Sequence, residues 1–134
     1  AGHEIKNPTN RIQEVIEQTG LGLMQTKKIN QLSKGYKQRV GMAAAIIHSP
    51  ILLILDEPTA GLDPNQLTEI RALIKSLSAN AMILFSTHIL QEVTAICDRV
   101  LVLNKGKLVA NDGIAALAQK HEAGLEEIFK MLTH

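Results

Sequence analysis

The sequence predicts an α/β fold in which a largely parallel sheet is flanked by helices. Two short apolar runs, residues 51–55 and 82–85, have the length of buried strands. Each run is followed by a segment with apolar residues at helical spacing, so strands and helices alternate. The residues before about 50 show only helical patterns. We therefore expect residues 1–49 to form a helical part and residues 50–134 to form the part that contains the sheet.

The helical part is predicted to contain two main helices. The first covers residues 10–18 and ends near Gly20 and Gly22; its apolar positions are Ile12, Val15 and Ile16. The second begins after Ser33, which is a good N-cap, and Pro50 ends it. We expect its packing face to consist of Val40, Ala43, Ala44 and Ile47.

The sheet part begins with residues 51–55, a continuous apolar run typical of a strand that is covered on both faces. Asp63 as N-cap and Pro64 at the first helical position predict the next helix. Its apolar positions are Leu67, Ile70, Ile74 and Leu77. Residues 82–85 repeat the buried-strand pattern, and the helix that follows is marked by Ile89, Val93 and Ile96.

The end of the chain predicts a β-hairpin and two short helices. Residues 100–103 and 107–110 flank Asn-Lys-Gly, a sequence typical of a tight turn. The helices are expected near residues 113–120 and 125–132. We find no internal repeat or flexible linker, so one domain accounts for the chain.

Composition excludes several classes of protein. The net charge is +1, so no strong electrostatic field indicates nucleic acid or an anionic membrane as a partner. Aromatic residues make up 2% of the chain, which argues against a single-strand nucleic-acid binder that stacks bases. The apolar runs are far shorter than the roughly 20 residues that span a bilayer. One cysteine, Cys97, cannot form an internal disulfide, and we expect a soluble chain in a reducing cytoplasm.

The first candidate site is the pair Asp56 and Glu57 at the end of the first predicted strand. Ligands of open parallel sheets bind beyond the carboxyl ends of the strands. Asp56 could hold Mg²⁺, usually through water, and Glu57 could polarise an attacking water molecule. For an isolated Asp-Glu pair, an ordinary strand-to-loop transition is the more frequent explanation.

The second candidate site is the sequence Leu-Ser-Lys-Gly-Tyr at residues 32–36, where a loop enters a helix. Free backbone N–H groups, the helix dipole and the Ser33 hydroxyl together make an anion site, and Gly35 would let a phosphate approach closely. A plain helix cap with a solvated Lys34 is the simpler alternative. Gly35 favours the anion site, since a helix interior gains nothing from glycine.

The third candidate is His88, which follows the second predicted strand and is expected at the same sheet edge as Asp56. It could donate a hydrogen bond to a terminal phosphate. A histidine at a strand end is more often structural.

These motifs occur in a fixed order, and in that order they resemble the ATP-binding cassette (ABC) family over residues 29–110. Residues 32–36 look like its signature motif, residues 51–56 like Walker B and residues 60–63 like the D-loop. Glu57 matches the catalytic glutamate and His88 the switch histidine. The resemblance implies the P-loop NTPase-like fold of ABC ATPases. It also makes the whole chain the C-terminal part of one such domain, with residues 1–49 as the remainder of its helical subdomain.

Two narrower resemblances refine the family. The closing residues 125–129 look like the end of ATPases that serve ABC-2 type exporters. Residues 32–39, Leu-Ser-Lys-Gly-Tyr-Lys-Gln-Arg, look closest to the gliding-motility-associated ATPases of that group.

The family mechanism implies that ATP lies between two subunits arranged head to tail. By this resemblance Ser33 and Gly35 contact the γ-phosphate of ATP held by the partner, with Lys34 and Tyr36 beside them. The other roles implied are Asp56 for Mg²⁺, Glu57 as base or water-orienter, His88 as γ-phosphate sensor and Asp63 as the link between the two sites. A membrane permease is the implied partner, which places the protein on the cytoplasmic side of the plasma membrane.

Two departures from the family pattern affect these expectations. Lys34 and Tyr36 replace the usual Gly and Gln of the signature motif. No G-x-x-x-x-G-K-[ST] sequence occurs in these 134 residues, and neither an adenine-stacking aromatic residue nor a Q-loop can be located. Because Walker A supplies the main phosphate contacts, we expect this chain alone to bind Mg-ATP far more weakly than a complete subunit and not to hydrolyse it.

Two other functions share some of these motifs. One is a non-hydrolytic interaction module that lends its signature face to another subunit. The other is an ABC-type DNA-repair or ribosome-associated ATPase, which would be expected to show long coiled-coil heptads or basic arms. Neither feature occurs in this sequence.

Overall fold

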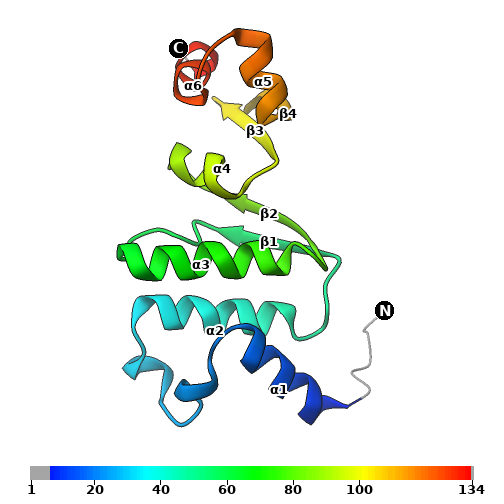
Figure 1. The fold of residues 1–134 in the computed structure, drawn as a ribbon, viewed down its shortest axis with the longest axis vertical. Coiled ribbons are helices and arrows are strands. Elements are labelled where there is room, and N and C mark those ends of the chain that lie inside the picture. Colours follow the sequence, from blue (N-terminus) through cyan, green and yellow to red (C-terminus); the bar gives the residue numbers. More distant parts are fainter. Residues whose placement is uncertain (1–6, 134) are drawn as a thin grey trace. The chain divides into compact units, whose positions relative to one another are not determined.

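A computed structural model describes residues 7–133 and divides the chain into two compact units, one up to Ser86 and one from Thr87 (Figure 1). The predicted helical part starts at residue 1, and residues 1–6 lie outside those described. In the first unit the chain is helical up to Ile46, as predicted. Its elements are α1 (Pro8–Gln18), the 3-10 turns η1 (Gly22–Met24) and η2 (Ile29–Gln31), α2 (Lys34–Ile46), β1 (Leu52–Asp56), α3 (Pro64–Leu77) and β2 (Met82–Ser86).

Two arginines join α1 and α2. Arg11 donates from Nε to the carbonyl of Ile47 (3.0 Å) and from Nη2 to the carbonyl of Ile46 (2.8 Å). The last carbonyls of a helix have no partner within the helix, so Arg11 satisfies two of them at the end of α2. Arg39 on α2 donates in turn to the carbonyl of Thr19, the residue that ends α1 (2.9 Å). Charge-assisted hydrogen bonds from Arg11 and Arg39 therefore hold α1 and α2 together at the end of each helix.

The packing face of α2 differs from the prediction. Its buried residues are Gly35, Met42 and Ile46, whereas Ala44 is exposed. The apolar and small residues of α2 surround most of the helix, so periodicity could not choose between neighbouring faces. The approach of α3, which lies between α2 and the strands in Figure 1, decided which face became buried.

β1 and β2 form a parallel pair in which Asp56 lies opposite Ser86. The parallel arrangement confirms the prediction, but burial on both faces is wrong. Leu53 and Leu55 are 3% and 8% exposed, whereas Leu52 and Ile54 are 45% and 67% exposed. Alternate side chains of a strand point to opposite faces, so the described residues cover one face of β1 and leave the other open.

β2 departs from the prediction in the same way, because Met82 and Leu84 are exposed. Ile83 and Phe85 are half-buried, and Ser86 at the end of the strand is exposed. α3 agrees better with expectation: Ile70, Ile74 and Leu77 are buried together with Leu73, and Leu67 is half-buried. The amphipathic pattern therefore predicted the buried face of α3 correctly, whereas the continuous apolar runs did not predict the burial of β1 and β2.

The second unit contains α4 (Leu90–Ile96), β3 (Arg99–Asn104), β4 (Lys107–Gly113), α5 (Ile114–His121) and α6 (Leu125–Thr133). β3 and β4 form the predicted antiparallel hairpin, and Lys105 and Gly106 between them both have positive φ (49° and 75°). Two consecutive positive φ values match a tight primed turn, which explains the glycine. The core of the unit includes Val93, Val102, Leu117 and Ile128.

Cys97 follows α4 and is partly buried. Burial, together with the negative charges of Asp98 and Glu92, raises the pKa of its thiol to about 11. The thiol is therefore protonated at neutral pH. Within residues 7–133, no helix combines the length and apolar character needed to cross a membrane.

Candidate functional site

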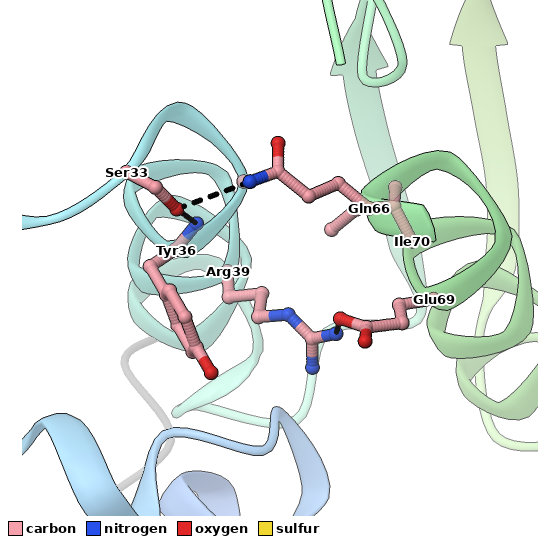
Figure 2. A pocket seen from close by; sticks show the side chains of 7 residues that line it. Ser33, Tyr36, Arg39, Gln66, Glu69 and Ile70 are labelled. Atoms are coloured by element: carbon pink, nitrogen blue, oxygen red, sulfur yellow. Dashed lines mark hydrogen bonds and ion pairs between the residues drawn. The ribbon is translucent and has the colours of Figure 1, made fainter. Parts of the chain in front are cut away.

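The first part of the candidate site is the start of α2. Ser33 is the N-cap, with extended backbone (φ −61°, ψ 164°), as the sequence predicted. Its Oγ accepts a hydrogen bond from the backbone N–H of Tyr36 at 3.4 Å. It also accepts one from Nε2 of Gln66 on α3 at 3.3 Å (Figure 2). The signature-like loop is thus connected to the helix that follows the D-loop-like segment.

Gly35 is buried against the same glutamine. A Cβ atom on Gly35 would lie 3.0 Å from Cδ, 3.1 Å from Oε1 and 3.2 Å from Cγ of Gln66. Such contacts are tighter than ordinary packing allows, so any side chain at position 35 would displace Gln66. The structure therefore gives Gly35 a packing reason that the sequence did not suggest. Its predicted closeness to a phosphate stays a prediction.

Lys34 lies over the D-loop-like segment. A Cβ atom on Gly61 would lie 2.5 Å from Nζ of Lys34 and 3.6 Å from its Cε. Gly61 also has a positive φ of 66°, which only glycine adopts at low cost. The backbone therefore favours glycine at position 61, whereas the ammonium group of Lys34, at the end of a flexible side chain, could move aside.

Tyr36 and Arg39 lie on the next turn of α2. The guanidinium carbon of Arg39 is 5.8 Å from the centre of the Tyr36 ring, within cation–π range. Nη2 of Arg39 forms an ion pair with Oε2 of Glu69 on α3 at 2.5 Å. Figure 2 shows this ion pair and the Ser33–Gln66 hydrogen bond as two bridges between α2 and α3. A small pocket between them is lined by Ser33, Gly35, Tyr36, Arg39, Gln66, Glu69 and Ile70.

The second part of the candidate site is the end of β1. The Ser86 hydroxyl donates to Oδ1 of Asp56 at 2.5 Å, and the backbone N–H of Glu57 donates to Oγ of Ser86 at 3.1 Å. The same N–H also donates to the Ser86 carbonyl at 3.2 Å. Ser86, from the neighbouring strand, therefore fixes both members of the predicted acidic pair at the carboxyl edge of the sheet.

Glu57 has a left-handed backbone with φ of 45°. This conformation is uncommon for a residue other than glycine and costs on the order of 1–3 kcal/mol. It turns the chain sharply out of β1, immediately after Asp56 and before the buried Pro58 and Thr59. Strain of this kind is concentrated at functional sites, where surrounding contacts maintain it.

Asp63 and His88 are the two remaining residues predicted for the site. Oδ1 of Asp63 accepts from the backbone N–H groups of Asn65 and Gln66, both at 3.0 Å, so Asp63 is the predicted N-cap of α3. His88 is exposed and belongs to the second unit, two residues beyond the end of β2. Its expected position beside Asp56 stays a prediction.

The donor set at the end of β1 fits Mg²⁺ in the way that the ion is usually bound. Mg²⁺ keeps several water ligands and takes one or two carboxylates together with substrate phosphates. Asp56 supplies one carboxylate, oriented by Ser86. Across residues 7–133 no three His, Cys, Asp or Glu side chains gather into a cage, so an all-protein site of the kind that binds zinc does not occur there.

Four residues in these contacts were not singled out in the sequence: Arg39, Gln66, Glu69 and Ser86. Ser86 had a usable signal, because it ends the second strand directly opposite Asp56 once the strands are paired. Gln66 had none, because it lies 33 positions from Ser33 and resembles an ordinary first-turn residue of α3.

Comparison with known proteins agrees with this geometry. Residues 3–60, which contain the signature-like motif and the acidic pair, match the ABC transporter family. The uncharacterized ABC transporter ATP-binding protein YdbJ of Bacillus subtilis is 42% identical over 120 residues, which cover 88% of this chain and 39% of the relative. The bacitracin transport ATP-binding protein BcrA of Bacillus licheniformis is 43% identical over 119 residues, which cover 87% of this chain and 39% of the relative.

A solved structure described as the ATP-binding subunit of an ABC transporter matches with a TM-score of 0.77 and 28% identity. The match covers 95% of this chain and 55% of the solved chain. The chain spans about 39% of the length of the two relatives named above. The predicted α/β fold of an ABC ATPase domain is thereby confirmed as a partial domain. The motifs, the fold and the relatives agree that the chain belongs to the ABC transporter ATP-binding protein family.

Proposed function

We propose that the protein containing these residues is the ATP-binding and ATP-hydrolysing subunit of an ABC transporter. In this proposal two copies bind ATP between them, and closure of the dimer drives a membrane permease. The relatives named as ATP-binding proteins of transporters support the assignment. Attachment to a permease would hold the protein at the cytoplasmic face of the plasma membrane. Nucleic acid has no part in this function.

The observation that carries the proposal is the geometry at the end of β1. Asp56 and Glu57 leave a parallel sheet at its carboxyl edge, and Ser86 holds them both. Asp56 would orient Mg²⁺, and Mg²⁺ when bound would neutralise developing phosphate charge. Glu57 follows β1 directly with a left-handed backbone, and in this proposal its side chain would act as base or orient the attacking water.

The start of α2 would provide the second half of each composite site. Ser33 and Gly35 would face the γ-phosphate of ATP held by the partner, flanked by Lys34 and Tyr36. His88 would sense the γ-phosphate and Asp63 would link the two sites. The contacts of α2 with α3 through Gln66 and Glu69 support this reading, because they fix the loop that would meet the phosphate.

The direction of transport is part of the proposal. We assign the protein to the ABC-2 export type, which the similarity to a bacitracin transport protein supports. The resemblance of residues 32–39 to gliding-motility-associated ATPases stays a prediction.

The test replaces Glu57 with glutamine in the complete protein. Glu57→Gln keeps the shape of the side chain and removes its basicity, so we expect the kcat for ATP hydrolysis to fall by about 10²-fold or more. ATP binding, followed by equilibrium titration, should be retained. Glu126→Gln, at an exposed position in the first turn of α6, is the matched control and should leave turnover unchanged. Unchanged turnover in Glu57→Gln would reject the assigned role.

The same experiment separates the alternative, a non-hydrolytic interaction module. A wild-type protein that associates with another ATPase subunit but shows no turnover of its own would favour that alternative. ATP hydrolysis that depends on Glu57 would exclude it.

A further inference from the structure

Both acceptor positions of the Ser33 hydroxyl are filled within the chain. A serine hydroxyl has two acceptor lone pairs and one hydrogen to donate. Oγ of Ser33 receives the N–H of Tyr36 at 3.4 Å and Nε2 of Gln66 at 3.3 Å. The O–H hydrogen must then point away from both donors. Ser33 is exposed, so this hydrogen is available to a ligand that accepts hydrogen bonds.

Gln66 is itself held from two directions. Its backbone N–H donates to Oδ1 of Asp63 at 3.0 Å, which fixes it in the first turn of α3. Its side chain fills the space that a Cβ on Gly35 would need, with Cδ, Oε1 and Cγ of Gln66 within 3.0–3.2 Å of that position. A side chain confined at both ends loses little further freedom when it makes a hydrogen bond. Gln66 therefore holds Ser33 at little additional entropic cost.

We propose that Gln66 is a positioning residue that keeps the Ser33 hydroxyl as a hydrogen-bond donor toward a phosphate. This inference rests on the proposed ATPase function and deepens it. It adds a link inside one subunit, from the D-loop-like segment through Asp63 and Gln66 to the signature-like loop. Through this link, the position of the first turn of α3 controls the orientation of the Ser33 hydroxyl.

The chemistry of the side chain at position 66 decides the expected effects. A glutamate there would accept the Ser33 hydrogen and remove the donor from the phosphate, and it would also add negative charge beside an anion. A methionine would remove the amide without adding charge, so the hydroxyl would be free to rotate. We expect the glutamate to be the more harmful of the two.

The experiment measures kcat and KM for ATP hydrolysis in the complete protein carrying Gln66→Glu or Gln66→Met, each with and without Ser33→Ala. Net hydrogen-bond contributions correspond to a fall in kcat of about threefold for Gln66→Met and about tenfold for Gln66→Glu. In the Ser33→Ala background Gln66→Met should not lower kcat further, because the hydroxyl it acts through is gone. Gln66→Glu should lower kcat less there than in the presence of Ser33, because only the effect of its negative charge remains. Gln119→Glu, at an exposed position of α5, is the matched control and should retain wild-type kinetics.

Two results would overturn the inference. One is wild-type kcat in Gln66→Glu. The other is an equal loss in the presence and absence of Ser33, which would mean that Gln66 acts through stability. Thermal unfolding of each variant shows whether it folds, and if Gln66→Glu does not, Gln66→Met carries the test. Failure of the proposed function would give a different result. The wild-type protein would then show no ATP turnover, or turnover that does not depend on Glu57, and the inference about Gln66 would be rejected with it.

Discussion

The two helices that meet at the pocket begin with different caps. At α3, Oδ1 of Asp63 accepts two backbone N–H groups at 3.0 Å, from Asn65 and Gln66. At α2, Oγ of Ser33 accepts only one N–H of its own helix, at the longer distance of 3.4 Å. Its second acceptor position is occupied by a side chain from α3. The Asp63 carboxylate accepts hydrogen bonds from its own helix, α3. The Ser33 hydroxyl accepts hydrogen bonds from both α2 and α3, and its own hydrogen remains available for donation.

This difference indicates that Asp63 mainly stabilises the fold, whereas Ser33 is available to bind a ligand. A charged cap with two short hydrogen bonds stabilises the start of a helix more than a long bond to a neutral hydroxyl. We therefore expect replacements at Asp63 and Ser33 to affect different measurements. Three replacements test this comparison, in order of expected effect.

The largest effect is expected from Ser33→Ala in the complete protein. Removing a preorganised donor to a developing phosphate charge should lower kcat for ATP hydrolysis by about 10²-fold. The weak cap predicts a loss of stability at the low end of the usual range, about 0.5 kcal/mol. Steady-state kinetics and urea unfolding measure the two quantities. A large loss of stability with normal turnover would reverse the comparison.

Asp63→Ala should instead lower stability, by about 1–2 kcal/mol, because two backbone N–H groups lose their acceptor. Asp63→Asn is the informative control, since asparagine caps helices as well as aspartate does. It should retain the free energy of unfolding while removing the charge. If Asp63→Asn unfolds normally but loses ATPase activity, the carboxylate has the additional role between two subunits that the family resemblance implies.

The smallest effect is expected from Gly35→Ala. Alanine favours a helix over glycine by about 1 kcal/mol, but its Cβ would crowd Gln66, so the two terms oppose each other. We expect stability to change by less than about 1 kcal/mol while kcat falls a fewfold, because Gln66 must release Ser33. In a Gln66→Ala background the crowding is gone, and Gly35→Ala should then be stabilising. If Gly35→Ala is destabilising in that background, the added Cβ clashes with a residue other than Gln66.

Local signals were the reliable part of the sequence analysis. Ser33 and the pair Asp63 and Pro64 predicted where α2 and α3 begin, and the structure confirms both starts. The hairpin turn at Lys105 and Gly106 was also predicted correctly. Each of these features depends on residues within three or four positions of one another, so neighbouring residues contain the necessary information.

Predictions that depended on distant partners were less reliable. The continuous apolar run before Asp56 indicated burial on both faces, yet Ile54 is 67% exposed while Leu53 is 3% exposed. The contact of Gly35 with Gln66 was not foreseen either, and it changed the explanation for the glycine. In both cases the missing information was which other segment of the chain would pack there.

The sequence by itself determined the order of strands and helices, the caps that begin α2 and α3, and the position of Asp56 and Glu57 at a strand end. These follow from backbone preferences and short-range periodicity. Only the tertiary structure decided that Ser86 holds both acidic residues, that Gln66 holds Ser33, and that one face of β1 is covered. Such contacts join residues about 30 positions apart, and they form only because packing of α3 and pairing of β2 bring those residues together.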